Sequence, residues 1–186
     1  MDLRLIAFLL FVTAFLFCIA AFATFYWKRS RARAKVEWKH LIARLTFLDR
    51  DSIQQVALDH IDDFGGVRDD EGARLLDSSD VWHLIGGMPG LVALERNCEV
   101  LIELACYLQR WYPEAMMAAE QLRNDAREIQ WHVGRLKDAV IPGKMESEFA
   151  DYARPAIAGY YLMTRRVLAL YEAADFMALA ELQRTI

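Results

Sequence analysis

The sequence predicts an all-α protein with a single N-terminal transmembrane helix followed by an antiparallel helical bundle of four to six helices. Three observations predict this architecture. Residues 5–27 carry no charged side chain, and residues 28–35 then carry five Lys or Arg. Beyond them, apolar residues recur at alternating steps of three and four, as on one face of a helix, and no stretch alternates with the period of a strand.

The uncharged segment has the length and the flanks of a membrane span. As a helix it would rise about 35 Å, enough to cross a hydrocarbon core about 30 Å thick. Aromatic and then basic residues follow it, the order expected at the cytoplasmic interface of a membrane. We expect contact with membrane lipid at Tyr26, Trp27, Lys28, Arg29, Arg31, Arg33 and Lys35.

This charge distribution predicts an inner (plasma) membrane protein with its N-terminus outside and its C-terminal domain in the cytoplasm. A cleaved signal peptide is the alternative, because Ala21-Phe22-Ala23 resembles a cleavage site. Against it, the uncharged run is longer than a usual signal segment, and the basic cluster beyond the site would resist translocation. We therefore divide the chain into an anchor (1–27, span 5–27), a basic juxtamembrane collar (28–35) and an acidic helical-bundle domain (36–186).

Charge and cysteine usage exclude several classes of protein. After residue 35 the chain holds 16 Lys and Arg against 25 Asp and Glu, a net charge of −9. Such a domain repels nucleic acid, which is excluded as a partner, and is expected to stand off an anionic bilayer. Cys98 and Cys106 lie too far apart on one predicted helix to form a disulfide, and Cys18 lies in the span.

The bundle domain opens with two predicted helices. Apolar spacing predicts that the first continues directly from the span through Leu48. Asp51 and Gln54 form a possible capping box for the second, whose apolar side would be Ile53, Ala57, Ile61 and Phe64. The acidic segment Asp62–Glu71 does not fit the calcium-loop pattern and is predicted to be an exposed loop.

A short turn and a glycine-rich corner come next. Asp80 can cap a turn that contains Val81, Trp82, Leu84 and Ile85. The run from Gly86 to Gly90 has no Lys-Ser/Thr after it, so it is predicted to be a tight bend between helices and not a phosphate-binding loop.

Three long helices and a short one complete the predicted bundle. The first, Leu91–Tyr112, is apolar over most of its circumference and is expected to be central. The second begins at Pro113 and ends near Pro142, and its core positions would be Ala115, Ala119, Leu122, Ala126, Ile129, Val133, Leu136 and Val140. The third has Phe149, Ala153, Ala156, Tyr160, Met163, Val167, Leu170 and Ala174 on its apolar face. Pro155 would kink this helix or start it, and Asp175–Arg184 is predicted to be a final amphipathic helix using Phe176, Met177, Leu179, Ala180 and Leu182.

No combination of residues in the sequence predicts catalysis or a cofactor. Glu95, Glu99 and Glu103 share a helix face and could hold a metal, but bundle metal sites add Glu-x-x-His motifs from other helices. The only such motif is Glu37–His40, so a solvated face is the preferred interpretation. His60, His83 and His132 are scattered, and Glu128–His132 would be a surface pair.

Two further positions leave alternatives open. Asn97 lies off the polar strip of its helix, where it could fix the register of packing, contact a ligand or partner, or be exposed. Arg165 and Arg166 lie among tyrosines and could bind a phosphate or carboxylate, although an ordinary ion pair within the bundle is preferred.

These features predict a membrane-anchored cytoplasmic helical bundle that acts as a protein-interaction or scaffold module, with a protein partner or a second copy of itself. A small-molecule or signal-sensing bundle is the alternative, and it predicts a cavity lined by Tyr, Met and Arg. A metal-binding or enzymatic bundle is the third possibility, and the sequence leans against an enzyme.

Overall fold

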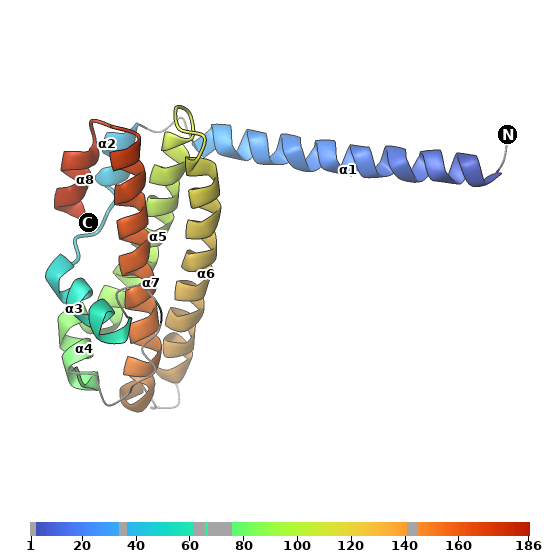
Figure 1. Ribbon diagram of the computed structural model, residues 1–186. Coiled ribbons are helices and arrows are strands. Elements are labelled where there is room, and N and C mark those ends of the chain that lie inside the picture. Colours follow the sequence, from blue (N-terminus) through green and yellow to red (C-terminus); the bar gives the residue numbers. More distant parts are fainter. Residues whose placement is uncertain (1–2, 34–36, 62–65, 67–75, 141–144) are drawn as a thin grey trace. The chain divides into compact units, whose positions relative to one another are not determined.

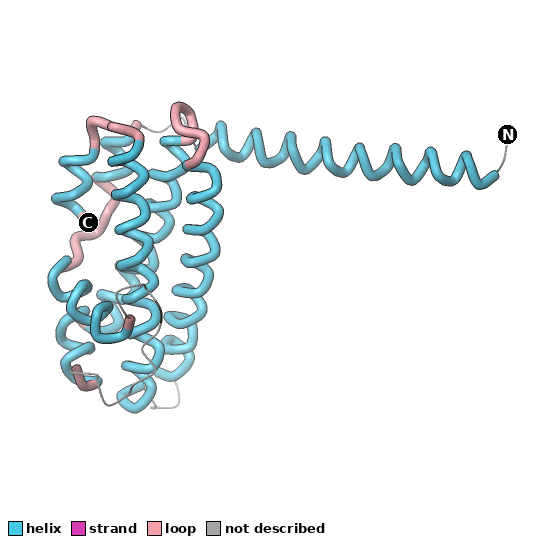
Figure 2. The backbone as a smooth tube through the Cα atoms, in the orientation of Figure 1, coloured by secondary structure: helices cyan, strands magenta, loops and turns pink. Residues whose placement is uncertain are grey.

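A computed structural model describes residues 3–33, 37–61, 66, 76–140 and 145–186 (Figure 1). It divides into two compact units, Met1–Val36 and Glu37–Ile186. All regular structure in the described residues is helical, which confirms the predicted all-α class (Figure 2). In the part of the second unit that the structure describes there are seven helices, more than the four to six that the sequence predicts.

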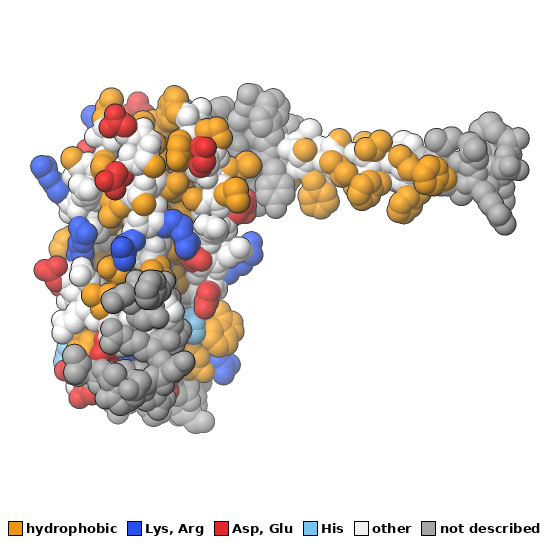
Figure 3. All heavy atoms as spheres, viewed as in Figure 1, with side chains coloured by type: hydrophobic (Ala, Val, Ile, Leu, Met, Phe, Trp, Pro, Cys, Tyr) orange, Lys and Arg blue, Asp and Glu red, His pale blue; other side chains and the backbone are white. Residues whose placement is uncertain are grey.

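The first unit contains one helix, α1 (Leu3–Arg33). Its described phenylalanines are 58–75% exposed, and Figure 3 shows hydrophobic side chains along this helix. Among the described residues, however, no helix has both the length and the apolarity that crossing a membrane requires. The structure therefore does not support the span predicted at 5–27. The side chains of the predicted interface residues 26–29, 31 and 33, and the whole of Lys35, lie outside the described part.

Three long helices form the body of the second unit: α5 (Gly87–Leu108), α6 (Ala115–Val140) and α7 (Met145–Ala173). Successive long helices run antiparallel, and four short helices cover them (Figure 1). The short ones are α2 (Trp38–Ile42), α3 (Arg50–His60), α4 (Ser78–Ile85) and α8 (Leu179–Thr185). Each of α5 and α7 contacts at least four other helices, and both contribute residues to the core. The central position predicted for α5 is therefore shared with α7.

The apolar spacing of α6 predicts its core face correctly. Seven of the eight predicted positions, from Ala115 to Leu136, are at most 5% exposed, and the side chain of Val140 lies outside the described part. The helix begins two residues later than predicted, and the Pro113 carbonyl accepts a hydrogen bond from the Met116 N–H. Pro142 lies outside the described residues.

The core face of α7 departs from the prediction near its C-terminal end. Tyr171 is fully buried and donates a hydrogen bond to the Leu104 carbonyl, whereas the predicted Leu170 is half-buried. A straight helix has 3.6 residues per turn, so a strict seven-residue pattern drifts off the buried face over several turns. Pro155 lies inside α7, which neither starts nor ends there.

The prediction that one helix runs unbroken through Leu48 is wrong. In the structure α2 ends at Ile42, and residues 45–49 have no regular structure. The side chain of Asn97 accepts a hydrogen bond from the Thr46 N–H (2.9 Å) and donates one to the Thr46 carbonyl (2.8 Å). Because Asn97 occupies both backbone groups of Thr46, a helix through this residue cannot use them.

The N-terminal caps of α3 and α4 each lie upstream of the predicted residue. Asp49, not Asp51, caps α3 by accepting a hydrogen bond from the Ser52 N–H (3.1 Å). Asp77 caps α4, and Asp80 completes that capping box by accepting from the Asp77 N–H. Hydrogen bonds from the Ser52 hydroxyl and N–H lower the pKa of the Asp49 carboxyl group. Hydrogen bonds from the Asp80 N–H and the Ser79 hydroxyl do the same for Asp77. Phe64 and the predicted loop 62–71, apart from Gly66, lie outside the described residues.

The bend predicted over Gly86–Gly90 is narrower in the structure: only Gly86 lies outside a helix, and α5 runs over Gly87–Leu108 instead of the predicted Leu91–Tyr112. Gly86 ends α4 in the left-handed conformation (φ 76°), and α5 begins at the next residue. A Cβ atom on Gly90 would lie only 1.7 Å from the Ile85 carbonyl oxygen. The corner therefore requires glycine for close approach of the backbone as well as for its dihedral angles.

The C-terminal helix is shorter than predicted. Asp175 has φ 46° and ends α7, and the Phe176 N–H then donates to the Tyr171 carbonyl. Leu182 is fully buried as predicted, whereas Met177 is 84% exposed and Ala180 is also exposed, so these two do not pack in the core.

Candidate functional site

The three glutamates of α5 do not form a metal site. Glu95 pairs with Lys137 of α6 (2.8 Å), and Glu103 pairs with Arg44 (2.5 Å). Both pairs join different elements and are partly exposed, as expected for stabilising contacts at the rim of a bundle. Among the described residues, no group of three His, Cys, Asp or Glu side chains could hold a metal ion.

The histidines lie on separate elements. His40 is exposed on α2, where Glu37 is the N-terminal cap residue, and His83 is exposed on α4. His60 is buried at the end of α3. His60 borders a cavity, and His132 lies in an aromatic cluster; both are described below.

Asn97 is buried and bonded within the protein, as the first of its three predicted roles, fixing the register of packing, requires. It is 2% exposed, and in addition to Thr46 its amide donates to the Tyr160 hydroxyl (3.2 Å). Burial raises the pKa of Tyr160, so this hydroxyl stays protonated. The side chain thus joins α5, α7 and the segment after α2, and its polar atoms are used inside the protein.

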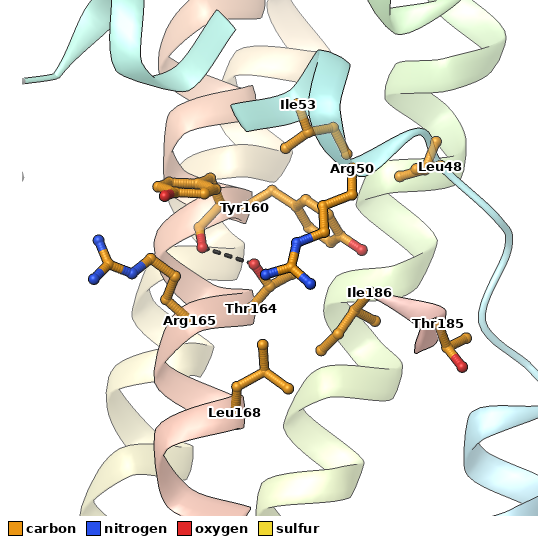
Figure 4. A pocket seen from close by; sticks show the side chains of 10 residues that line it. Leu48, Arg50, Ile53, Tyr160, Thr164, Arg165, Leu168, Thr185 and Ile186 are labelled. Atoms are coloured by element: carbon orange, nitrogen blue, oxygen red, sulfur yellow. Dashed lines mark hydrogen bonds between the residues drawn. The ribbon is translucent and has the colours of Figure 1, made fainter. Parts of the chain in front are cut away.

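The two adjacent arginines of α7 have different surroundings. Arg166 forms an ion pair with Asp125 of α6, the preferred prediction. Arg165 is exposed and lies over the Tyr161 ring, 5.7 Å from its centroid. Arg165 also borders a cavity of about 90 Å³ lined by Leu48, Arg50, Ile53, Tyr160, Tyr161, Thr164, Leu168, Thr185 and Ile186. Figure 4 shows Arg50 reaching toward Thr164, whereas Arg165 extends away from them.

A second cavity, of about 210 Å³, lies where the end of α3 meets α6 and α7. The Asp125–Arg166 ion pair borders it, as do His60 and Glu128. Gly159 lets α7 pack closely on α6 beside this cavity, since a Cβ atom there would lie only 3.2 Å from the Ile129 side chain. Both cavities are below the roughly 300 Å³ at which small-molecule sites usually begin.

An aromatic cluster is exposed on α6 and α7, and we call it the Trp131 surface. It consists of Trp131, His132, Arg135 and Tyr152. The Trp131 ring lies 4.9 Å from His132 and 5.9 Å from Tyr152, both edge-on, and the Arg135 guanidinium lies 5.9 Å from the Tyr152 ring centre. Trp131 remains 57% exposed despite these contacts. The ring contacts therefore hold a large aromatic side chain at the surface.

No family model, curated protein or solved structure matches this chain. The geometry of its own surfaces is therefore the guide to its function.

Burial lowers the pKa of His132, and the nearby Glu128 carboxylate only partly opposes this shift. The imidazole is thus neutral at neutral pH and adds no positive charge to the Trp131 surface. No hydrogen bond joins the predicted pair Glu128–His132, and the histidine packs against Trp131 and Tyr152 instead.

Sequence reasoning missed the Trp131 surface because it assigned only the apolar face of α6. A signal was present: Trp131 lies two residues after the core residue Ile129, off the buried face, and Arg135 follows one turn later. A tryptophan on the polar face of an amphipathic helix is unusual, since large apolar side chains there are not covered by the core. The partner from α7, Tyr152, could be found only from the packing of α7 on α6.

Proposed function

We propose that this chain is a membrane-anchored cytoplasmic protein-interaction or scaffold module. The anchor rests on the sequence, namely the uncharged residues 5–27 and the basic residues at 28–35. One contact in α1 suits a lipid environment: the Thr24 hydroxyl lies 2.9 Å from the Ala20 carbonyl oxygen, within reach of a bond inside the helix. A polar group in lipid needs such an internal partner.

The proposed orientation has a direct test. A reporter that is active only outside the inner membrane, fused after Ile186, is expected to stay inactive, whereas one that is active only in the cytoplasm should work. The same pair of reporters on a protein with the opposite orientation is the control. Activity of the external reporter would overturn the cytoplasmic assignment.

The interaction role is carried by the Trp131 surface. Trp, Tyr and Arg dominate the binding energy of protein interfaces, and here one of each lies together on two packed helices. Because α6 and α7 form the most extensive helix pair in the bundle, these side chains lose little further freedom on binding. The surface offers an exposed apolar ring whose position is held by its neighbours, so we propose a protein segment that presents an apolar side chain to it.

Site-specific photo-crosslinking tests this role. A photoreactive residue in place of Trp131 is expected to give a discrete protein adduct in intact membranes. The matched control is Gln130, which is exposed in the same turn but points about 100° away. Replacing Arg135 with alanine should weaken the adduct about ten-fold or more, as loss of an interface hot spot does, whereas Arg127→Ala should not.

Two results would contradict the proposal: equal crosslinking at positions 130 and 131, or an adduct that is indifferent to Arg135→Ala. An adduct of twice the chain's own mass would identify the partner as a second copy, provided that it forms at position 131 and not at 130 and is weakened by Arg135→Ala. The sensing alternative is less favoured, because the cavity lined by Tyr and Arg holds only about 90 Å³ and has no methionine in its lining.

A further inference from the structure

One end of the bundle carries a second exposed apolar cluster, which we call the end surface. It comprises Arg110, Trp111, Met116, Met117, Phe176 and Met177. Trp111, Met116, Met117 and Met177 are 58%, 60%, 70% and 84% exposed, respectively. The residues come from the α5–α6 connection, the first turn of α6 and the α7–α8 connection. Neighbouring large apolar side chains left this exposed mark a surface that something else covers.

Ring contacts join these connections into one surface. Phe176 lies 5.8 Å from Trp111 and 5.9 Å from Tyr107, which in turn lies 5.2 Å from Trp111. The Arg110 guanidinium lies within 6 Å of both the Tyr107 and Trp111 rings. An arginine stacked on aromatic rings keeps its charge at the border of an apolar patch, as residues at a membrane interface do.

The chain enters the domain at this same end. Thr46 bonds to Asn97, and Arg44 pairs with Glu103, which is further along α5. Going back from Thr46 to Arg44, the chain therefore runs alongside α5 in the direction of the end of that helix at Leu108. Figures 1 and 2 show α2 at the end of the bundle that also holds the α5–α6 and α7–α8 connections. Only Glu37 separates α2 from the first unit.

Charge limits which surface can cover this end. The domain's net charge of −9 opposes docking on an anionic bilayer, as the sequence predicts. Near the end surface itself, the acidic residues Glu114 and Asp175 outnumber Arg110, so charge does not favour docking there on an anionic bilayer. Docking there must come from burying apolar side chains, and tryptophan is the one among them that favours the boundary between headgroups and acyl chains.

We propose that the end surface docks on the bilayer that holds the anchor, with Trp111 and the three methionines at the lipid interface. This inference rests on the proposed membrane anchor. A domain tethered to a bilayer meets it at a high effective concentration, so even weak apolar contact needs no strong affinity. Docking would fix the tilt of the bundle on the membrane and keep the Trp131 surface at a set height above it.

The test uses the full chain in phosphatidylcholine nanodiscs, with Cys18→Ser and one new cysteine carrying a fluorophore. Met117→Cys probes the end surface, and Asp138→Cys is the control, about 30 Å away along α6 and exposed. Cys98 and Cys106 are buried, and burial raises the pKa of Cys98 to about 12, so neither should react in the folded protein. Lipids carrying a quencher near the interface report contact.

We expect several-fold stronger quenching at position 117 than at position 138, at both low and high salt because the contact is apolar. Adding Trp111→Glu and Met177→Glu, both at exposed positions, should lower the quenching at position 117 to that at position 138. Equal quenching in protein that stays with the nanodiscs would overturn the docking and leave the anchor standing.

Three other outcomes would also overturn it. Failure of the chain to stay with the nanodiscs would refute the anchor itself. If the cysteine at position 117 were shielded from labelling in native membranes but not in nanodiscs, a protein would cover the end surface. Quenching that requires anionic lipid and disappears at high salt would mean that charge, not apolar burial, brings the domain to the membrane.

Discussion

Replacing Gly90 with alanine is expected to lower the free energy of unfolding by about 3 kcal/mol, at the upper end of the range for overpacking. The new Cβ atom would lie 1.7 Å from the Ile85 carbonyl oxygen and 2.8 Å from its carbon. Both are backbone atoms, so no side chain can rotate to relieve the overlap. The corner between α4 and α5 must open, which disturbs the buried residues Ile85 and Leu91. Urea unfolding of the full chain in mild detergent, followed by circular dichroism, measures the effect.

Gly134→Ala is the matched control, because nothing lies within 4 Å of a Cβ atom at this position in α6. Alanine is a better helix former than glycine, so this variant should be more stable by up to about 1 kcal/mol. A Gly90→Ala protein as stable as the wild type would mean that the corner is not as tight as the structure has it.

Replacing Asn97 with alanine is expected to cost about 3 kcal/mol. The change removes three hydrogen bonds, two to the backbone of Thr46 and one to the Tyr160 hydroxyl, and each contributes about 0.5–1.5 kcal/mol. Thr46 is exposed, so water can replace part of what its backbone loses, and the expected total stays below the sum of the largest values for three hydrogen bonds. The same unfolding measurement applies.

Tyr160→Phe is the control for this prediction, because it removes only the hydroxyl that accepts from Asn97, and it should cost about 1 kcal/mol. Hydrogen exchange separates the two effects further. The Thr46 amide should be protected in the wild type and in Tyr160→Phe, and should exchange rapidly in Asn97→Ala. Retained protection in Asn97→Ala would show that Asn97 does not hold this segment.

Both positions show where sequence reasoning reached its limit. The glycine run predicted a bend, but five residues of glycine, methionine and proline do not reveal which glycine meets a backbone oxygen. The heptad spacing of Trp38, Leu41, Leu45 and Leu48 favoured a continuous helix, and the segment nevertheless leaves the helix after Ile42. Its Thr46 backbone bonds to a side chain 51 residues away, and local propensity contains no information about such a partner.

The candidate surfaces were predicted less well than the core. The apolar face of α6 follows from spacing alone, because burial of one helix face requires that spacing whatever the neighbour is. An exposed tryptophan is visible in the sequence, but the side chains that hold it are not. Trp131 and Tyr152 are 21 residues apart in the chain, and Trp111 and Phe176 are 65 apart, so each pair exists only because helices pack.

By itself, the sequence determined the all-α class, the buried face of α6, the bend at the glycine corner and the burial of Leu182. Each follows from local rules: helical periodicity, backbone dihedral preferences and the removal of apolar side chains from water. The tertiary structure alone decided the end of α2 at Ile42, the shift of the core to Tyr171, and the assembly of the Trp131 and end surfaces. These depend on which distant groups satisfy one another's hydrogen bonds and fill one another's space, and only the folded chain brings those groups together.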